Sequence, residues 1–129
     1  MDGMCEEYNR LVAALKTLEQ EGDPTADDPE MVTLPMAEDE WYTRPETVSY
    51  GTVSLDFEAD ALTGDDMKCS TAYGGSVDLF SLVRGGAGWV QMIMDTLTEH
   101  CGANWQLNSH QYERETGLYH WEWAFQVEG

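Results

Sequence analysis

The chain has 129 residues, the length of one domain with its own hydrophobic core, and its hydrophobic content of 42% argues against wholesale disorder. Its formal net charge of −19 disfavours binding to nucleic-acid phosphates or to an anionic membrane surface, because both require clustered Lys and Arg. No apolar run approaches the roughly 18 residues of a membrane-spanning helix, and the first residues lack a signal-peptide pattern, so we expect synthesis in the cytoplasm.

The first predicted element is an amphipathic helix over residues 5–20. Its apolar residues recur every three or four positions, which is the spacing of one helical face. They are Met4, Tyr8, Leu11, Val12, Leu15 and Leu18. Gly22 followed by Pro24 ends the helix, because neither residue continues a helical turn well. We expect the apolar face to pack on a sheet.

Residues 22–47 are predicted to be a long acidic loop. The segment contains all four prolines and many carboxylates, and prolines at this density exclude a continuous helix or a central strand. A short strand at residues 31–34 is the one regular element that the pattern favours. Trp41 and Tyr42 lie among charged residues, so we expect them to anchor the loop or to contact a partner. A loop of this length in a small domain is typical of a partner-binding arm or a partly disordered segment.

Two strands are predicted at residues 49–60 and 67–80. The first alternates apolar and polar residues, which is the pattern of a strand with one buried face. A Gly-Asp-Asp turn joins the two strands, and Gly74 and Gly75 inside the second strand predict a bulge. An acidic surface is expected on the polar face of the first strand and in the turn. Its residues are Asp56, Glu58, Asp60, Asp65 and Asp66.

The second half of the chain predicts a helix at residues 88–100 and a hairpin of two strands at 105–113 and 118–127. Gly117 ends the turn of this hairpin, where a positive φ angle is favoured. The last strand alternates strictly, with bulky apolar residues on one face. They are Tyr119, Trp121, Trp123, Phe125 and Val127. This alternation predicts a face that is buried or covered by a partner.

These elements predict a single α+β domain over residues 1–129. The expected order is α-β-β-α-β-β, with an antiparallel four-stranded sheet, two helices on one face of it and the long acidic loop after the first helix. The aromatic area exceeds what two helices can cover, above all if the last strand is a sheet edge, so we predict a protein interface. Its residues are Tyr119, Trp121, Trp123, Trp41 and Tyr42.

The sequence holds no strong pattern for catalysis or metal binding. His100, Cys101, His110 and His120 lack the paired spacing of zinc ligands, although the hairpin would bring the last two near each other. The carboxylates at residues 56–60 alternate along a strand face and are expected to be solvated, unlike the buried pair of a glycosidase. No nucleophile motif such as GxSxG occurs. We predict no enzymatic activity, no cofactor and no metal site.

The acidic charge allows several interpretations. Residues 1–66 carry 18 Asp and Glu against three Lys and Arg, whereas residues 67–129 carry seven against three. The simplest interpretation is solubility. Two others are mimicry of a DNA backbone and a surface that repels DNA passing close by.

Short stretches in the second half of the chain resemble small structural proteins of tailed phages. The stretches are GSVDLF at 75–80, WQLNS at 105–109, QYE at 111–113 and ETGLYHWEW at 115–123. Together with the chain length and the order of helices and hairpins, they are similar to the tail-terminator and tail-completion proteins of long-tailed phages and prophages of gut Firmicutes. The resemblance extends over residues 48–128.

The resemblance implies a ring-forming, non-enzymatic subunit, often hexameric, at the head-proximal end of the tail tube. The implied partners are further copies of the chain, tail-tube proteins and neck proteins, and the implied location is the virion. DNA would pass through the ring without sequence-specific binding, and an acidic lumen would keep it from adsorbing. A competing interpretation is an acidic DNA mimic or anti-defence inhibitor that occupies a basic nucleic-acid channel of a host enzyme. A small hydrolase that uses carboxylates is a third.

Overall fold

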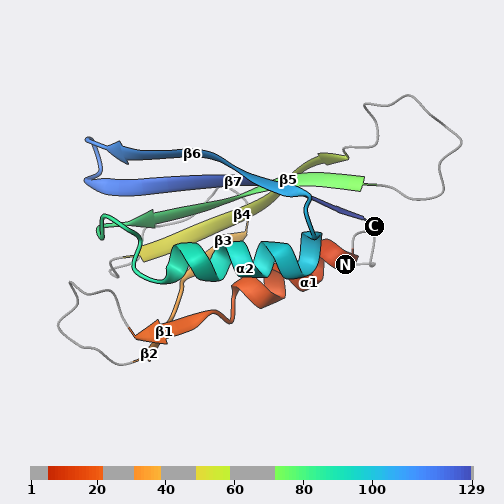
Figure 1. Ribbon diagram of the computed structural model, residues 1–129, viewed down its shortest axis with the longest axis horizontal. Helices are drawn as coiled ribbons and strands as arrows, with labels where there is room; N and C mark the ends of the chain where they lie inside the picture. The colour runs from red at the N-terminus through yellow and green to blue at the C-terminus, as the bar shows by residue number, and fades with distance from the viewer. Residues whose placement is uncertain (1–5, 22–30, 39–48, 59–71, 129) are drawn as a thin grey trace, which may run out of the picture.

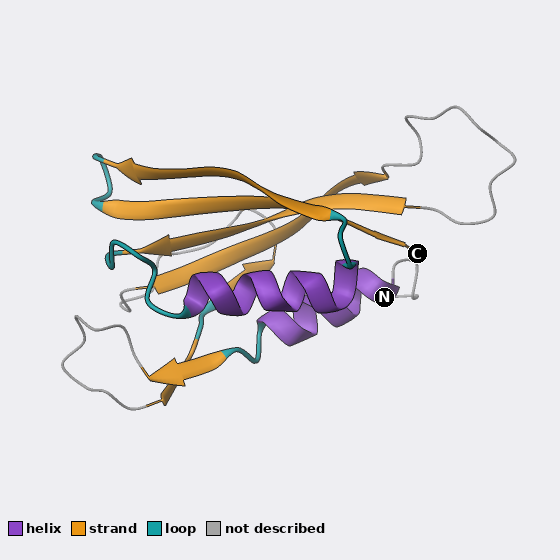
Figure 2. Ribbon diagram, in the orientation of Figure 1, coloured by secondary structure: helices purple, strands orange, loops and turns teal. Residues whose placement is uncertain are grey.

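The computed structural model describes residues 6–21, 31–38, 49–58 and 72–128, which form two helices and seven strands. In chain order these are α1 (Glu6–Leu15), β1 (Glu19–Glu21), β2 (Met31–Thr33), β3 (Met36–Glu38), β4 (Ser49–Glu58), β5 (Ala72–Ser81), α2 (Trp89–Cys101), β6 (Trp105–Glu113) and β7 (Leu118–Glu128). The two helices pack against each other on one face of the main sheet (Figure 1 and Figure 2). Neither helix of the described residues is long and apolar enough to cross a membrane.

The main sheet has five strands in the order β3-β4-β5-β7-β6. It is mixed, because β3 runs parallel to β4 while the other neighbours are antiparallel. β1 and β2 form a separate two-stranded antiparallel sheet. The predicted antiparallel four-stranded sheet with the order α-β-β-α-β-β is therefore wrong. The short strand predicted at residues 31–34 is confirmed as β2. β1 lies where the sequence predicted the end of the first helix, and β3 lies in the segment predicted to be an acidic loop.

The short strand β3 joins the sheet through contacts that cannot be recognised from a periodic pattern of apolar residues in the sequence. Three residues are too few to show an alternation, and the parallel pairing of Met36 with Gly51 depends on backbone atoms. The preceding Leu34 is buried, and its backbone N–H donates to the carbonyl oxygen of Leu18 at 3.0 Å. Pro35 is tolerated because it lies next to an edge strand, where its missing N–H is not needed.

Helix α1 ends at Leu15, five residues before the predicted end. After Leu15 the only apolar residue of the stripe is Leu18, so a further turn of helix would bury little apolar surface. The carbonyl oxygen of Ala14, at the helix end, accepts from the backbone N–H of Thr17 at 3.1 Å and from the Thr17 hydroxyl at 2.9 Å. The chain then extends into β1, where Glu19 pairs with Thr33 of β2.

The hydrophobic core lies between the two helices and the inner face of the main sheet. Its helical residues include Tyr8, Leu11, Val12, Leu15, Trp89, Ile93 and Leu97, and its sheet residues include Val53, Val77, Leu79, Trp121, Trp123, Phe125 and Val127. The apolar faces predicted for the first helix and for the last strand therefore supply half of the core residues. Each large apolar side chain that is fully buried contributes about 1.5–3 kcal/mol.

Gly75 allows Phe125 to pack closely against β5. A Cβ atom on Gly75 would lie 2.7 Å from Cζ of the Phe125 ring and would also meet the backbone oxygen of Ser54. The register between β4 and β5 shifts between Leu55 and Phe57, directly opposite this position. The sequence predicted a bulge in β5 at Gly74 and Gly75. The irregularity lies instead in β4, the strand paired with β5.

We expect Gly75→Ala to lower the free energy of unfolding by about 1–3 kcal/mol, because the added methyl group would overpack the core. The matched control is Gly85→Ala, since a Cβ atom at Gly85 has no atom within 4 Å. Urea unfolding of both variants measures the difference. Equal stability of the two variants would contradict this account of Gly75.

Candidate functional site

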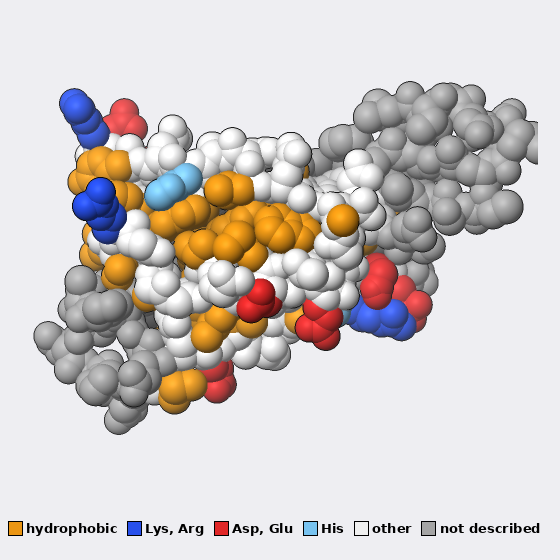
Figure 3. All heavy atoms as spheres, viewed as in Figure 1, with side chains coloured by type: hydrophobic (Ala, Val, Ile, Leu, Met, Phe, Trp, Pro, Cys, Tyr) orange, Lys and Arg blue, Asp and Glu red, His pale blue; other side chains and the backbone are white. Residues whose placement is uncertain are grey.

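The edge strand β6 carries an apolar side that the helices leave partly open. Four of its residues face the same side as the core residues of β7 because of the register: Trp105, Leu107, His110 and Tyr112 pair with Phe125, Trp123, Trp121 and Tyr119. The Trp105 indole N–H donates to Thr98 of α2 at 3.1 Å, so α2 covers the beginning of β6. Leu107 and Tyr112, further along, are 46% and 52% exposed. Figure 3 shows hydrophobic side chains gathered on this face of the molecule.

The predicted interface residues fall into three groups. Trp121 and Trp123 are buried in the core, and β7 lies between β5 and β6 rather than at an edge of the sheet. Tyr119 is half-buried and packs against Tyr112, with 4.9 Å between ring centroids. Trp41 and Tyr42 lie outside the described residues. The open apolar surface near the predicted interface therefore belongs to β6, the neighbour of the strand that the sequence indicated.

The predicted acidic surface lies largely outside the part of the chain that the structure describes. Asp56 and Glu58 are residues of β4, but only the strand itself is described there. Asp60, Asp65 and Asp66 lie outside the described ranges. Whether these five carboxylates form one surface stays a prediction.

The outer face of the sheet, opposite the helices, holds a histidine between two carboxylates. Nε2 of His120 lies 2.6 Å from Oδ2 of Asp78 on β5, and Nδ1 lies 2.8 Å from Oε2 of Glu113 at the end of β6. The Thr116 hydroxyl donates to the other carboxylate oxygen of Glu113 at 3.1 Å. Glu122 stands opposite Asp78 in the register. The arrangement connects β5, β7 and β6 on the face that the core does not use.

The two contacts favour the protonated form of His120. Ionised carboxylates only accept hydrogen bonds, so the ring can donate to both of them only as an imidazolium. Burial lowers the pKa of His120, but the hydrogen bonds and charges of Asp78 and Glu113 outweigh burial and raise this pKa above 6.5. Because both nitrogens are bound, neither is free to act as a general base.

An aromatic row holds the His120 ring in place. The rings of Phe80 and His120 stack with 4.2 Å between centroids, and Tyr50 stacks on Phe80 at 4.8 Å. The three residues stand opposite one another on β4, β5 and β7. Cross-strand aromatic pairs of this kind stabilise a sheet and fix its register.

The residues considered as metal ligands are not brought together. His110 stacks on Trp121 on the inner face, with 4.5 Å between centroids, whereas His120 lies on the outer face, so the hairpin separates them. Cys101 is buried in the core, and burial together with the charge of Glu7 raises its pKa to about 11. No group of three or more His, Cys, Asp or Glu among the described residues is arranged to hold a metal ion.

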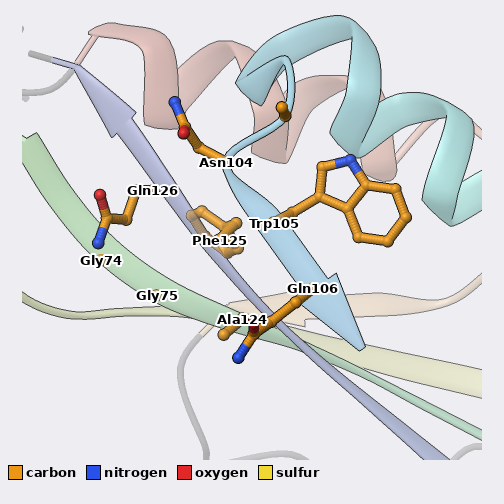
Figure 4. Close-up of a pocket in the computed structure, with 9 residues that line it drawn as sticks. Gly74, Gly75, Asn104, Trp105, Gln106, Ala124, Phe125 and Gln126 are labelled. Carbon is orange, nitrogen blue, oxygen red and sulfur yellow. The ribbon is translucent and has the colours of Figure 1, made fainter. Parts of the chain in front are cut away.

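A hollow of about 430 Å³ lies where β6 begins. Its floor is made by small residues, Gly74, Gly75 and Ala124, and carboxamide side chains stand around it, from Asn104, Gln106 and Gln126. Figure 4 shows the Trp105 indole pointing from this site toward α2. The lining residues include no charged group and no nucleophile, so the hollow offers hydrogen bonds to an uncharged polar group but no acid–base chemistry.

The His120 arrangement was not anticipated from the sequence. Strict alternation in the last strand already placed His120 on the polar face, and the same alternation applies to Asp78. The signal that was missing is the order of strands, because only the adjacency of β5, β7 and β6 brings Asp78 and Glu113 to opposite sides of one ring.

The comparisons with known proteins found no match: no protein-family model, no curated protein and no solved structure is similar to this chain.

We expect the His120 contacts to make stability depend on pH in a defined direction. The pKa of His120 is raised in the folded state, so its stabilising contribution is complete below pH 6.5 and is lost as the pH rises through the raised pKa. Above that pKa, Asp78, Glu113 and Glu122 face a neutral ring. His120→Gln should therefore lower the free energy of unfolding at a pH of about 6 and have a smaller effect at a pH of about 9.

Urea unfolding at both pH values measures this difference. His110→Gln is the control, because His110 bonds to no carboxylate in the described part of the chain. An effect of His120→Gln that is the same at both pH values would show that the charge of the ring does not stabilise the fold.

Proposed function

We propose that this protein is a non-enzymatic structural subunit that associates with further copies of itself through strand β6. The observation that carries the proposal is the combination of an unpaired strand edge with exposed apolar side chains on the same strand. Among the described strands, β6 pairs with β7 alone. It is nine residues long and exposes Leu107 and Tyr112.

Edge strands of this length normally carry features that prevent association, such as Lys, Pro or very short length. β6 contains no Lys and no Pro, and its one irregularity is the register shift between Leu107 and Ser109. A second chain that adds to this edge would pair with its free backbone groups and cover the open apolar side. Continuous pairing at a sheet edge is a common way to build an oligomer.

The chemistry of the described residues supports a role without catalysis. Both nitrogens of His120 are bound, Cys101 is buried as a thiol, and the hollow near β6 has no charged group. The sequence resemblance to phage tail-terminator and tail-completion proteins suggests a specific form of the proposal. In that form the chain builds a ring at the head-proximal end of the tail tube, as part of the virion, and binds tail-tube and neck proteins.

The competing proposal, an acidic mimic of DNA, requires carboxylates spaced along one rigid surface. The acidic residues of the described ranges are instead spread over both helices and both sheets. Two of them, Asp78 and Glu113, are bound to His120. We therefore favour assembly.

The native mass of the protein tests the proposal. We expect a multiple of 14.5 kDa, and we expect Leu107→Asp to weaken self-association roughly tenfold or more, which corresponds to about 1.4 kcal/mol. The carboxylate would be introduced into an apolar contact without changing the core. Trp121 and Trp123 are unsuitable for this test, because their replacement would disrupt the core.

Val32→Asp is the matched control, because Val32 is similarly exposed, at 40%, but belongs to the separate two-stranded sheet. Analytical ultracentrifugation over a range of concentrations gives the masses. A wild-type protein that stays monomeric at high concentration, with no binding to tail-tube protein, would refute the proposal.

A further inference from the structure

Two of the four basic residues in the described ranges have no ion-pair partner among the described residues. Arg10 lies 3.1 Å from Glu7, and Lys16 lies 3.7 Å from Glu38. Arg84 and Arg114 form no salt bridge with any described residue. Unpaired guanidinium groups are unexpected in a chain with a net charge of −19, since carboxylates are available almost everywhere.

The two arginines lie at the same end of the sheet. Arg84 belongs to the loop between β5 and α2, and Arg114 belongs to the turn between β6 and β7. Ser81, the last residue of β5, pairs with Tyr119 at the start of β7, so this loop and this turn leave the sheet next to each other. The Gly86 N–H donates to the carbonyl oxygen of Val83 at 2.9 Å, which fixes the turn that follows Arg84.

Exposed apolar side chains accompany the two arginines. Leu82, two residues before Arg84, is 43% exposed, and Tyr112, two residues before Arg114, is 52% exposed. We call Leu82, Arg84, Tyr112 and Arg114 the Arg corner. Figure 3 shows basic and hydrophobic side chains together at the end where Figure 1 places this loop and this turn.

We infer that the Arg corner binds an acidic surface on a second copy of this chain, namely the exposed face of α2 that carries Asp95 and Glu99. This inference rests on the proposed function and adds a second contact between copies, next to the end of β6. Asp95 and Glu99 are one turn apart on α2, both are exposed, and neither forms a salt bridge within the described residues. Asp95 does accept a hydrogen bond from Gln91 at 2.9 Å. The contact would therefore join two cations of one copy to two anions of the next, none of which forms a salt bridge within the described residues.

A second copy fits the Arg corner better than a nucleic acid does. Two arginines cannot offset the repulsion between a phosphate backbone and a chain with a net charge of −19. Two carboxylates on a helix are a small target, and Leu82 and Tyr112 would supply apolar contact around them. The surfaces that meet are different from each other, so the contact is of the head-to-tail kind that closes into a ring when the rotation between copies allows it.

A charge exchange between the two surfaces tests the inference. We expect Arg84→Glu with Arg114→Glu to weaken self-association at least tenfold, and Asp95→Lys with Glu99→Lys to weaken it similarly. Mixing equal amounts of the two double variants should restore association, because each mixed contact again joins opposite charges. Raising the salt concentration should weaken the wild-type contact.

The matched control is Arg10→Glu with Lys16→Glu, which changes the net charge by the same amount as the reversal of the Arg corner but affects cations that are paired within the chain. If this control weakens association equally, or if mixing fails to restore it, the Arg corner is not the contact and only the inference is refuted. If the wild-type protein is monomeric, the proposed function itself fails. Binding of a DNA duplex that is lost on reversal of the Arg corner would also overturn the inference.

Discussion

The fold depends on the burial of one face of β7. Trp121, Trp123 and Phe125 alternate on this strand, and both helices pack over them. The packing is dense enough that Gly75 must lack a side chain beside Phe125. It also leaves the indole N–H of Trp123 buried with no hydrogen-bond partner among the described residues, which costs about 1–3 kcal/mol. Apolar burial outweighs this cost, because a fully buried large side chain contributes about as much and many are buried together.

The central position of β7 also determines what the two faces of the sheet can do. The inner face of β7 is buried in the core. The polar side chains of β7 therefore lie on the outer face, where His120 contacts Asp78 and Glu113. Since Glu113 is the last residue of β6, the same contacts tie the edge strand to the middle of the sheet. These contacts hold the end of β6 to the sheet, so a partner that added to its edge, as we propose, would have to order less of the strand on binding.

The sequence predicted the elements whose apolar residues repeat at a regular spacing. It did not predict the strand pairings, which depend on contacts between residues far apart in the chain. The 3.6-residue spacing of Tyr8, Leu11 and Leu15 and the alternation of Trp121, Trp123 and Phe125 correctly indicated buried faces. The short strand at 36–38 could not be found, because three residues show no period and their parallel pairing with β4 is a backbone interaction. The sequence drew attention to Trp121 and Trp123, which are buried, and not to the exposed Leu107 and Tyr112 on the neighbouring strand, because it does not reveal that β7 lies between β5 and β6.

Self-association of a chain this acidic requires that attraction be local. At physiological salt, charges are screened beyond roughly 8 Å, so two copies repel mainly where carboxylates approach each other closely. Strand β6 has one carboxylate, Glu113, and that group is already bound to His120. Within the described residues, the open side of β6 therefore carries no unpaired carboxylate of its own, and Arg84 and Arg114 lie beside it without a salt bridge, although the exposed Glu115 follows Arg114 in the same turn. The association that we propose would act at short range on this side of the strand, where screening keeps most of the −19 charge from opposing it.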